Sequence, residues 1–224
     1  FQFGTISTGI IYIGVLLAAK LIIGLPFSLY STFVIEEKFG FNKTTPKTFI
    51  VDLVKGLGLA VVLGIPVLAL VLWCFESMGE YSWLYVWVAI TGITLIIQYI
   101  APVWIMPLFN KFTPLEDGEL KTSILDYAKS VNFPLKGVFV MDGSKRSSKS
   151  NAFFTGFGKN KRIALFDTLI EKHSVNEMVA ILAHEIGHYQ KKHIMKGMVI
   201  GVIETGLTLF LLSIFLSHKG LFDT

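Results

Sequence analysis

Four apolar stretches dominate this sequence, and each is long enough to cross a lipid bilayer as a helix. They lie within residues 1–34, at residues 56–75 and 81–110, and from about residue 197 to residue 217. A helix of about 20 apolar residues spans the hydrocarbon layer of a bilayer. Apolar residues make up 53% of the 224 residues and charged residues only 16%, whereas soluble domains carry about a quarter charged residues. The sequence therefore predicts a mainly α-helical, polytopic transmembrane protein.

The charges in the loops orient these segments in the membrane. Lys38, Lys43 and Lys47 follow the first apolar stretch, while the short link at residues 76–80 holds no lysine or arginine. Residues 111–196 contain 12 lysines and two arginines. Because basic loops stay on the cytosolic side of a membrane, we expect the first loop and residues 111–196 to face the cytosol together. Two crossings separate them, which agrees with this topology.

The chain divides by polarity into three regions. We expect residues 1–110 to form a membrane region with about three transmembrane helices, residues 111–195 to form a cytosol-facing insert, and residues 196–224 to add a further transmembrane helix. An insert of about 85 residues is large enough to fold by itself. The first residue is Phe1 rather than Met, so we expect the chain to be a portion of a longer protein.

The insert combines helix and strand signals. Residues 114–133 have apolar side chains at helical spacing, namely Leu120, Ile124, Leu125, Ala128 and Val131. The run GVFVM at residues 137–141 is typical of a strand. Residues 151–166, NAFFTGFGKNKRIALF, contain two strand-like runs around GFGKN, which predicts a β-hairpin with its turn at residues 156–160. The sequence therefore predicts a small α+β insert.

The last part of the insert, HSVNEMVAILAHEIGHYQKKH at residues 173–193, predicts an amphipathic helix. Ser174 followed three residues later by Glu177 is a capping box, so we expect the helix to begin at about residue 175. Apolar residues on one arc should face a core, and these are Val175, Met178, Val179, Leu182 and Ile186. His184 and His188 are one turn apart on roughly the opposite side.

The pattern His184-Glu185-x-x-His188 (HExxH) is the helical zinc motif of metalloproteases. Two imidazoles one turn apart can bind one metal ion together. Zinc in such a site polarises a scissile carbonyl and acidifies a water molecule. A carboxylate that is not a ligand can take the proton of that water and pass it to the leaving amine. We therefore expect Zn2+ as cofactor, the two histidines as metal ligands and Glu185 as the catalytic carboxylate.

A catalytic zinc ion normally has three protein ligands, and neither candidate for the third fits a continuous helix. His193 would point about 180° from His184 and about 140° from His188, so we expect it to be a core or interface histidine. Glu204 would lie about 24 Å beyond His188 along the helix axis. A carboxylate within an apolar span is still a functional signal, because it is costly there. We expect the third ligand to lie beyond Thr224.

Two segments of the insert each allow two interpretations. SKRSSKS at residues 144–150 is basic, which is typical of a solvated loop or of a segment in contact with acidic lipid headgroups. Residues 151–154 are predicted to form an edge strand beside the site. Such a strand can bind an extended substrate by strand addition, or it can be an ordinary hairpin strand. In the first case, the substrate-binding residues are Asn151, Ala152 and Phe153.

Four longer motifs carry a resemblance to a known family. They are LPFSLYSTFVIEEKFGFNKTT (25–45), PLFNKFTPLEDGELK (107–121), SKRSSKSNAFFTGFGKNKRIALFDTLI (144–170) and LAHEIGHYQKKH (182–193). Together they closely resemble the zinc-dependent CAAX prenyl protease type 1 family, and the resemblance extends over nearly the whole chain.

The resemblance implies an integral-membrane zinc endopeptidase whose seven helices enclose a chamber, with a site near the cytosolic face. Eukaryotic members remove the last three residues of prenylated CAAX proteins. By matched position, His184 and His188 correspond to zinc ligands, Glu185 to the catalytic carboxylate, and Asn151 and Ala152 to the substrate-binding strand. The third ligand of the family is a glutamate well downstream, so we expect the 224-residue chain by itself to bind zinc weakly.

The predicted function is a zinc-dependent membrane endopeptidase that cleaves the C-terminal tripeptide of prenylated CAAX proteins or related membrane-associated peptides. One alternative is an HtpX-like quality-control metalloprotease that uses the same residues. Others are a transporter with Lys20 and Glu204 along its path, and a scaffold that binds lipidated tails without cleaving them.

The predicted partners are prenylated or membrane-associated substrates and the lipid bilayer. Nucleic acid is not expected, because the net charge is only +4 and the basic residues lie in loops. We expect a multi-pass membrane protein with its active site towards the cytosol. The membrane is a bacterial inner membrane, or the endoplasmic reticulum and nuclear envelope in a eukaryote.

Overall fold

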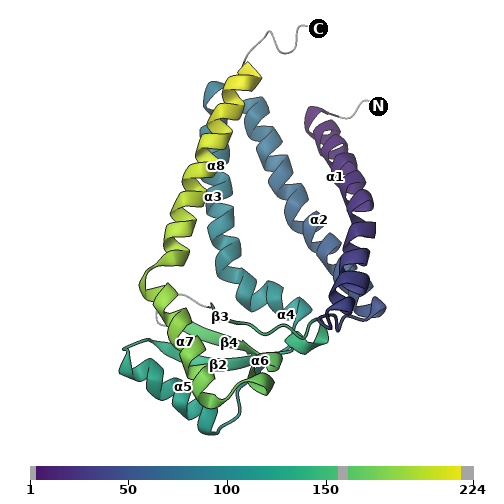
Figure 1. The fold of residues 1–224 in the computed structure, drawn as a ribbon. Helices are drawn as coiled ribbons and strands as arrows, with labels where there is room; N and C mark the ends of the chain where they lie inside the picture. Colours follow the sequence, from purple (N-terminus) through teal and green to yellow (C-terminus); the bar gives the residue numbers. More distant parts are fainter. Residues whose placement is uncertain (1–3, 156–160, 218–224) are drawn as a thin grey trace. The chain divides into compact units, whose positions relative to one another are not determined.

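The computed structural model describes residues 4–155 and 161–217 and divides the chain into two compact units. The first unit comprises Phe1–Ser28, Leu53–Ile96 and Met195–Thr224. The second comprises Leu29–Asp52 and Ile97–Ile194. The long helices are shared between the units, and the sheet lies wholly in the second (Figure 1).

Among the described residues, four helical segments are long and apolar enough to cross a membrane, as the sequence predicts. The bounds are Thr5–Glu36, Pro46–Ser77, Gly79–Phe109 and His193–Leu216, so each segment passes its predicted apolar stretch at one end at least. The helices that build them are α1 (Thr5–Tyr30), α2 (Pro46–Ser77), α3 (Ser82–Ile100), α4 (Met106–Phe109) and α8 (His193–Ser217). Short 3-10 and π-helical turns complete the spans: η1 (Ser31–Glu36), η2 (Gly79–Tyr81) and η3 (Ala101–Ile105).

Within the first unit, a glycine lets α3 and α8 approach closely. The indole Nε1 of Trp87 on α3 donates a hydrogen bond of 2.8 Å to the carbonyl oxygen of Val202 on α8. A Cβ atom added at Gly206 would lie only 2.9 Å from that Nε1. Nearby, the rings of Trp83 and Phe210 meet edge to face at 5.2 Å. Small residues commonly allow such close packing of membrane helices.

The second unit contains a sheet of four strands in the order β1-β2-β4-β3. Their bounds are β1 (Phe112–Pro114), β2 (Leu135–Met141), β3 (Ala152–Thr155) and β4 (Lys161–Phe166). β2 and β4 are parallel, whereas β1 pairs with β2 and β3 pairs with β4 in antiparallel fashion. The predicted strand at residues 137–141 and the two hairpin strands are therefore confirmed. The turn predicted at residues 156–160 lies outside the described residues.

The predicted helix at residues 114–133 is shorter than expected. Its first residue belongs to β1, and the helix itself is α5 (Glu119–Ser130), which begins directly after Gly118. Apolar side chains of α5 still face the core as its periodicity predicts, since Ile124 and Ala128 are buried. The difference arises because Pro114 pairs with Phe139 of β2, a long-range contact that no local pattern shows.

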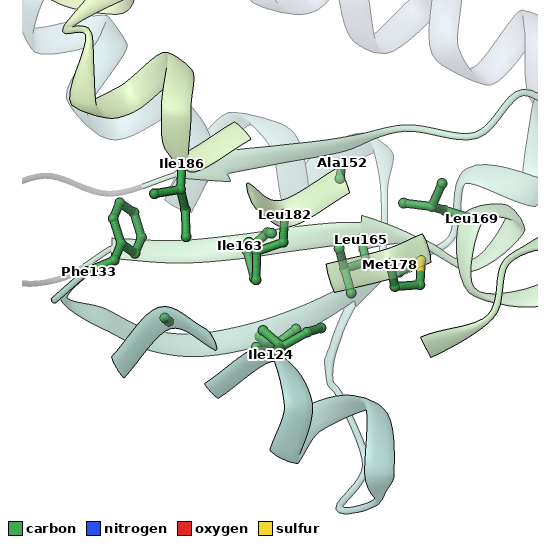
Figure 2. Close-up of a cluster of buried hydrophobic side chains, with 11 residues drawn as sticks. Ile124, Phe133, Ala152, Ile163, Leu165, Leu169, Met178, Leu182 and Ile186 are labelled. Carbon is green, nitrogen blue, oxygen red and sulfur yellow. The ribbon is translucent and has the colours of Figure 1, made fainter. Parts of the chain in front are cut away.

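One face of the sheet carries the core of the second unit. Helices α5 and α7 (Val175–Gln190) contact each other and pack on this face, and α6 (Asp167–Lys172) follows β4. Figure 2 shows Leu182 and Ile186 of α7 directed towards the strands, where they join Ile163 and Leu165 of β4. Burial of this cluster holds the helix with the HExxH motif against the sheet.

The basic segment at residues 144–150 is not a solvated loop, because Arg146 binds several partners. Its Nε and Nη2 atoms donate to the two carboxylate oxygens of Asp52 at 2.7 and 2.8 Å. Nη1 donates to Oδ1 of Asn110, and Nη2 also donates to the carbonyl oxygen of Phe109, both at 2.7 Å. The hydrogen bonds to Asp52 raise the pKa of Arg146, which therefore stays charged.

Further contacts tie the same segment to the loop before α2. The amide of Lys43 donates to the carbonyl oxygen of Arg146 at 3.0 Å, and the amide of Ser148 donates to that of Phe41 at 2.9 Å. Lys149 forms an ion pair with Glu36 at 2.7 Å. A short helical turn, η4 (Gly143–Lys145), precedes these contacts. The chain is thus anchored directly before it enters β3.

Candidate metal centre

The capping box predicted at the start of α7 is present, and it sets where the helix begins. The amide and hydroxyl of Ser174 donate to Oε2 of Glu177 at 2.8 and 2.9 Å. In return, the amide of Glu177 donates to the Ser174 hydroxyl at 3.5 Å. The bonds from the backbone and the side chain of Ser174 lower the pKa of Glu177. The helix begins at Val175, as predicted.

The helical phase then separates a buried face from a face that carries the motif. Met178, Leu182 and Ile186 are buried at 1%, 1% and 2% exposure, while Val175 and Val179 are half-buried. These five positions confirm the predicted inner arc. With 3.6 residues per turn, the histidines at positions 184 and 188 fall on the other side, and both are exposed.

His184 and His188 direct the same ring nitrogen towards each other. Their Nε2 atoms lie 2.9 Å apart, and their ring centroids are 4.6 Å apart at an interplanar angle of 80°. Two nitrogens bound to a tetrahedral zinc ion at about 2.0–2.1 Å would be about 3.3 Å apart. A small rotation of either ring gives this separation, so the donor pair fits zinc. Glu185 lies between the two histidines in the chain and is half-buried.

The two histidines would supply only part of a zinc coordination shell. Within residues 4–155 and 161–217, no group of three or more His, Cys, Asp or Glu side chains is arranged to hold a metal ion. Glu204 belongs to the first unit, and the exclusion of this residue as a ligand stays a prediction. The location of the third ligand beyond Thr224 likewise stays a prediction.

The prediction that a continuous helix directs His193 away from His188 was wrong, because α7 does not run continuously into α8. α7 ends at Gln190, Lys192 adopts a left-handed conformation with φ of 55°, and α8 begins at His193. This break brings Nδ1 of His193 to 2.7 Å from Nδ1 of His188. His193 is exposed rather than buried in a core. No glycine, asparagine or proline marks the break in the sequence, so pattern reasoning missed it.

A buried lysine near the motif was also missed. Lys161, at the start of β4, is 4% exposed, and its Nζ lies 3.4 Å from the ring centroid of Tyr189 and 4.8 Å from that of Phe133. The two aromatic rings meet edge to face at 5.2 Å. A cation over aromatic faces is stabilising, so this cluster links the last turn of α7 to the sheet. The sequence feature that could have indicated this cluster is Tyr189, the aromatic residue directly after His188.

β3 lies at an edge of the sheet, as predicted for residues 151–154, and the side chains of Ala152 and Phe153 pack within the second unit. The side chain of Ala152 is 6% exposed within the core, and Phe153 packs against Phe166 at 6.2 Å. The amide of Phe166 donates to the carbonyl oxygen of Asn151. Because antiparallel pairing alternates, Ala152 and Phe154 direct their backbone groups to the outer edge.

That outer edge is partly occupied by the strand's own side chain. Oδ1 of Asn151 accepts a hydrogen bond of 2.9 Å from the amide of Ala152. Asn151 itself is exposed. Among the described strands, none pairs with the outer edge of β3. An incoming extended peptide would therefore replace one side-chain acceptor and add hydrogen bonds to two residues.

An HExxH helix packed on a small sheet, in a chain with four candidate membrane spans, defines the class of integral-membrane metallopeptidases. Comparison with known families agrees. Residues 1–111 match the family described as CAAX prenyl protease N-terminal, five membrane helices, and residues 114–223 match peptidase family M48. The chain belongs to peptidase family M48, and specifically to its CAAX prenyl protease type 1 members.

Several curated relatives are similar to the chain over most of its length. CAAX prenyl protease 1 of Saccharomyces cerevisiae is 46% identical over 222 residues, which is 98% of this chain and 49% of that protein. The Arabidopsis thaliana homolog is 52% identical over 75% of this chain and 40% of its own length. The Homo sapiens homolog is 39% identical over 89% of this chain and 50% of its own length.

A solved structure has the same fold. The crystal structure of S. mikatae Ste24p matches with a TM-score of 0.89 and 47% sequence identity, over 95% of this chain and 49% of that one. The chain thus spans about half the length of the relatives that it matches.

Proposed function

We propose that the complete protein is a zinc-dependent membrane endopeptidase that cleaves the C-terminal tripeptide of prenylated CAAX proteins or related membrane-associated peptides. The observation that carries this proposal is the 2.9 Å approach of the Nε2 atoms of His184 and His188, with Glu185 beside them on the same helix. The names of the similar proteins support the prenylated substrate class.

The residues divide the chemistry between them. His184 and His188 would hold the zinc ion, which would supply Lewis acidity towards the scissile carbonyl and the attacking water. Glu185 accepts the proton of that water and delivers it to the leaving amine. Glu185 is half-buried on α7, between the two histidines in the chain, and the capping box and the buried core fix the position of this helix.

The outer edge of β3 binds the substrate in an extended conformation. The amide and carbonyl groups of Ala152 and Phe154 pair with the substrate backbone, and Asn151 releases the amide of Ala152 to allow this. Strand addition satisfies the backbone of any sequence. Selection of a lipidated tail therefore depends on groups other than the backbone of β3.

We place the active site on the cytosolic side of the membrane. The lysines at positions 38, 43 and 47 and the basic residues of the insert support this orientation. The similar proteins reported above are from eukaryotes, which favours the endoplasmic reticulum and nuclear envelope over a bacterial inner membrane.

The test compares the full-length protein with its Glu185→Gln variant on a prenylated and an unmodified CAAX peptide. Glutamine keeps the shape of the side chain but cannot accept the proton, so turnover should fall by about 100-fold or more while zinc stays bound. Equal cleavage of the two peptides would favour the quality-control alternative. Unchanged activity in Glu185→Gln would exclude the peptidase mechanism and favour a transporter or scaffold.

A further inference from the structure

We propose that His193 is a positioning residue that sets the tautomer and the ring orientation of His188 for metal binding. The inference rests on the proposed zinc site, but not on the identity of the substrate. It concerns a contact that the HExxH pattern does not include, because His193 lies five residues beyond His188 and opens the following helix.

Each ring nitrogen of His188 faces a nitrogen of another histidine. Its Nε2 faces Nε2 of His184 at 2.9 Å, and its Nδ1 faces Nδ1 of His193 at 2.7 Å. A neutral imidazole carries one proton, and the nitrogen that binds a metal must be the unprotonated one. If Nε2 of His188 binds zinc, the proton is on Nδ1, and Nδ1 of His193 accepts it in a hydrogen bond.

Such a bond has a known consequence for metal ligands. The second ring nitrogen of a metal-binding histidine usually donates to a nearby acceptor, which holds the ring in place and increases the basicity of the ligand. The rings of His188 and His193 are 5.0 Å apart and inclined at 64°. His193 thus supports the ligand from the edge of the ring opposite to the metal.

The backbone between the two residues is built for this contact. The amides of Lys191 and Lys192 donate to the carbonyl oxygens of Gly187 and Tyr189 at 3.0 and 2.8 Å, which closes α7. Lys192 then takes a φ of 55°, a conformation that residues with a Cβ atom rarely adopt. On a continuous helix His193 would point about 140° away from His188. Unfavourable backbone conformations of this kind concentrate at functional sites.

His193 does not act as a third ligand of the same ion. The nitrogen of His188 that it meets is Nδ1, on the far side of the ring from the Nε2 pair. An ion bound by both Nε2 atoms is therefore too far from Nδ1 of His193 for a direct bond between them. The remaining alternative is a purely structural hydrogen bond that joins α7 to α8.

The test measures zinc affinity of the full-length protein by competition with a chromophoric chelator. His193→Leu removes the acceptor, and we expect zinc binding to weaken by about 10–100-fold. His193→Asn keeps an acceptor, because Oδ1 of asparagine stands at the same distance along the side chain as Nδ1 of histidine. We expect this variant to bind zinc within a few-fold of the native protein.

Lys192→Gly serves as the matched control for the backbone break, because glycine adopts the left-handed conformation without strain. It should retain native zinc affinity. Native affinity in His193→Leu, or an equal loss in His193→Leu and His193→Asn, would overturn the positioning role. Amide hydrogen exchange across residues 186–196 gives a second readout: exchange that increases in His193→Leu without a loss of zinc affinity would identify a purely structural bond.

These outcomes are separate from those of the proposed function. A protein that binds zinc through His184 and His188 but does not cleave a prenylated peptide refutes the substrate proposal and leaves the His193 measurement valid. A protein that cleaves the peptide but shows native zinc affinity in His193→Leu refutes only the positioning role.

Discussion

Arg146 donates a hydrogen bond to each carboxylate oxygen of Asp52, at 2.7 Å from Nε and at 2.8 Å from Nη2. The pair connects the segment that leads into β3 with the start of α2 (Pro46–Ser77). Both side chains are about three-quarters buried, with 25% and 24% exposure. The contact therefore belongs to the framework of the second unit rather than to its solvated surface.

Replacement of Arg146 by lysine should loosen this framework although the charge is kept. Lysine cannot form the bidentate contact with Asp52, and it cannot bond to Asn110 and Asp52 at the same time. Loss of charge-assisted hydrogen bonds should cost about 2 kcal/mol of local stability. Hydrogen exchange of the amides at residues 144–155 should then become about 30-fold faster.

Lys145→Met is the matched control for Arg146→Lys, because it changes an exposed neighbour in the same segment. It should leave the exchange rates unchanged. Native exchange in Arg146→Lys would show that the contact does not hold the entry to β3.

The start of α7 should loosen in acid. Bonds from the Ser174 backbone and hydroxyl hold the pKa of Glu177 below its ordinary value of 4.5. The pKa of Glu177 is thus lower in the folded than in the unfolded protein. The stability that its carboxylate contributes is therefore present above the unfolded pKa and is lost as the pH falls through the folded pKa. The protection of the first α7 amides, measured relative to their exchange in the unfolded chain at the same pH, should therefore decrease as the pH drops below about 4.5.

Two variants separate this titration from the cap itself. Glu177→Gln can still accept hydrogen bonds but does not titrate, so the acid dependence should flatten. Ser174→Ala should cost about 1 kcal/mol at neutral pH. An unaltered pH profile in Glu177→Gln would assign the acid response to another group.

Gly206 should be intolerant of a side chain. A Cβ atom there would lie 2.9 Å from Nε1 and 3.1 Å from Cε2 of Trp87, and the indole is held by its bond to Val202. We expect Gly206→Ala to destabilise the packing of α3 and α8 by about 1–3 kcal/mol, measured as thermal unfolding in detergent micelles.

Gly201 on the same helix is the matched control for Gly206→Ala. A Cβ atom at Gly201 meets no heavy atom within 4 Å. Gly201→Ala should therefore be neutral or slightly stabilising, because alanine favours the helix. Equal effects of the two substitutions would contradict the role of the close approach to Trp87.

Substrate binding at β3 should depend on every second backbone amide of the peptide. The outer edge presents the backbone groups of Ala152 and Phe154, two residues apart, and strand pairing alternates in the same way. N-methylation of one substrate amide at a time should raise KM about 10-fold at alternate positions. A uniform effect along the peptide, or none, would exclude strand addition.

Helix α7 shows which structural features can be predicted from the sequence. Its start, its buried face and the approach of His184 to His188 follow from signals within one helix, namely a capping box and a 3.6-residue period. Local periodicity also places the four candidate spans, because each needs only its own apolar residues.

The features that were missed depend on pairing between distant segments or on rare backbone conformations. The strand at Phe112–Pro114 exists because it pairs with β2, and Arg146 is only partly exposed because Asp52, far earlier in the chain, forms an ion pair with it. The turn at Lys192 lacks the glycine or asparagine that usually marks a left-handed residue. These differences explain why the approach of His184 to His188 was predictable and the contact of His188 with His193 was not.

Zinc binding by the 224-residue chain and by the full-length protein can be compared directly, to test whether the chain holds all the ligands. If the third ligand is a glutamate beyond Thr224, the isolated 224-residue chain should bind zinc far more weakly than the full-length protein. Chelator competition on the two proteins in the same detergent measures the difference. Equally tight, stoichiometric binding would place all the ligands within the 224 residues.

The zinc content of the full-length protein and its variants, measured by mass spectrometry of the metal, tests the central claim most directly. We predict one zinc ion per chain in the native protein and in Glu185→Gln, which should nevertheless lose most turnover. We predict almost none in His184→Ala and in His188→Ala after mild chelation. Retention of zinc in both histidine variants would contradict the account.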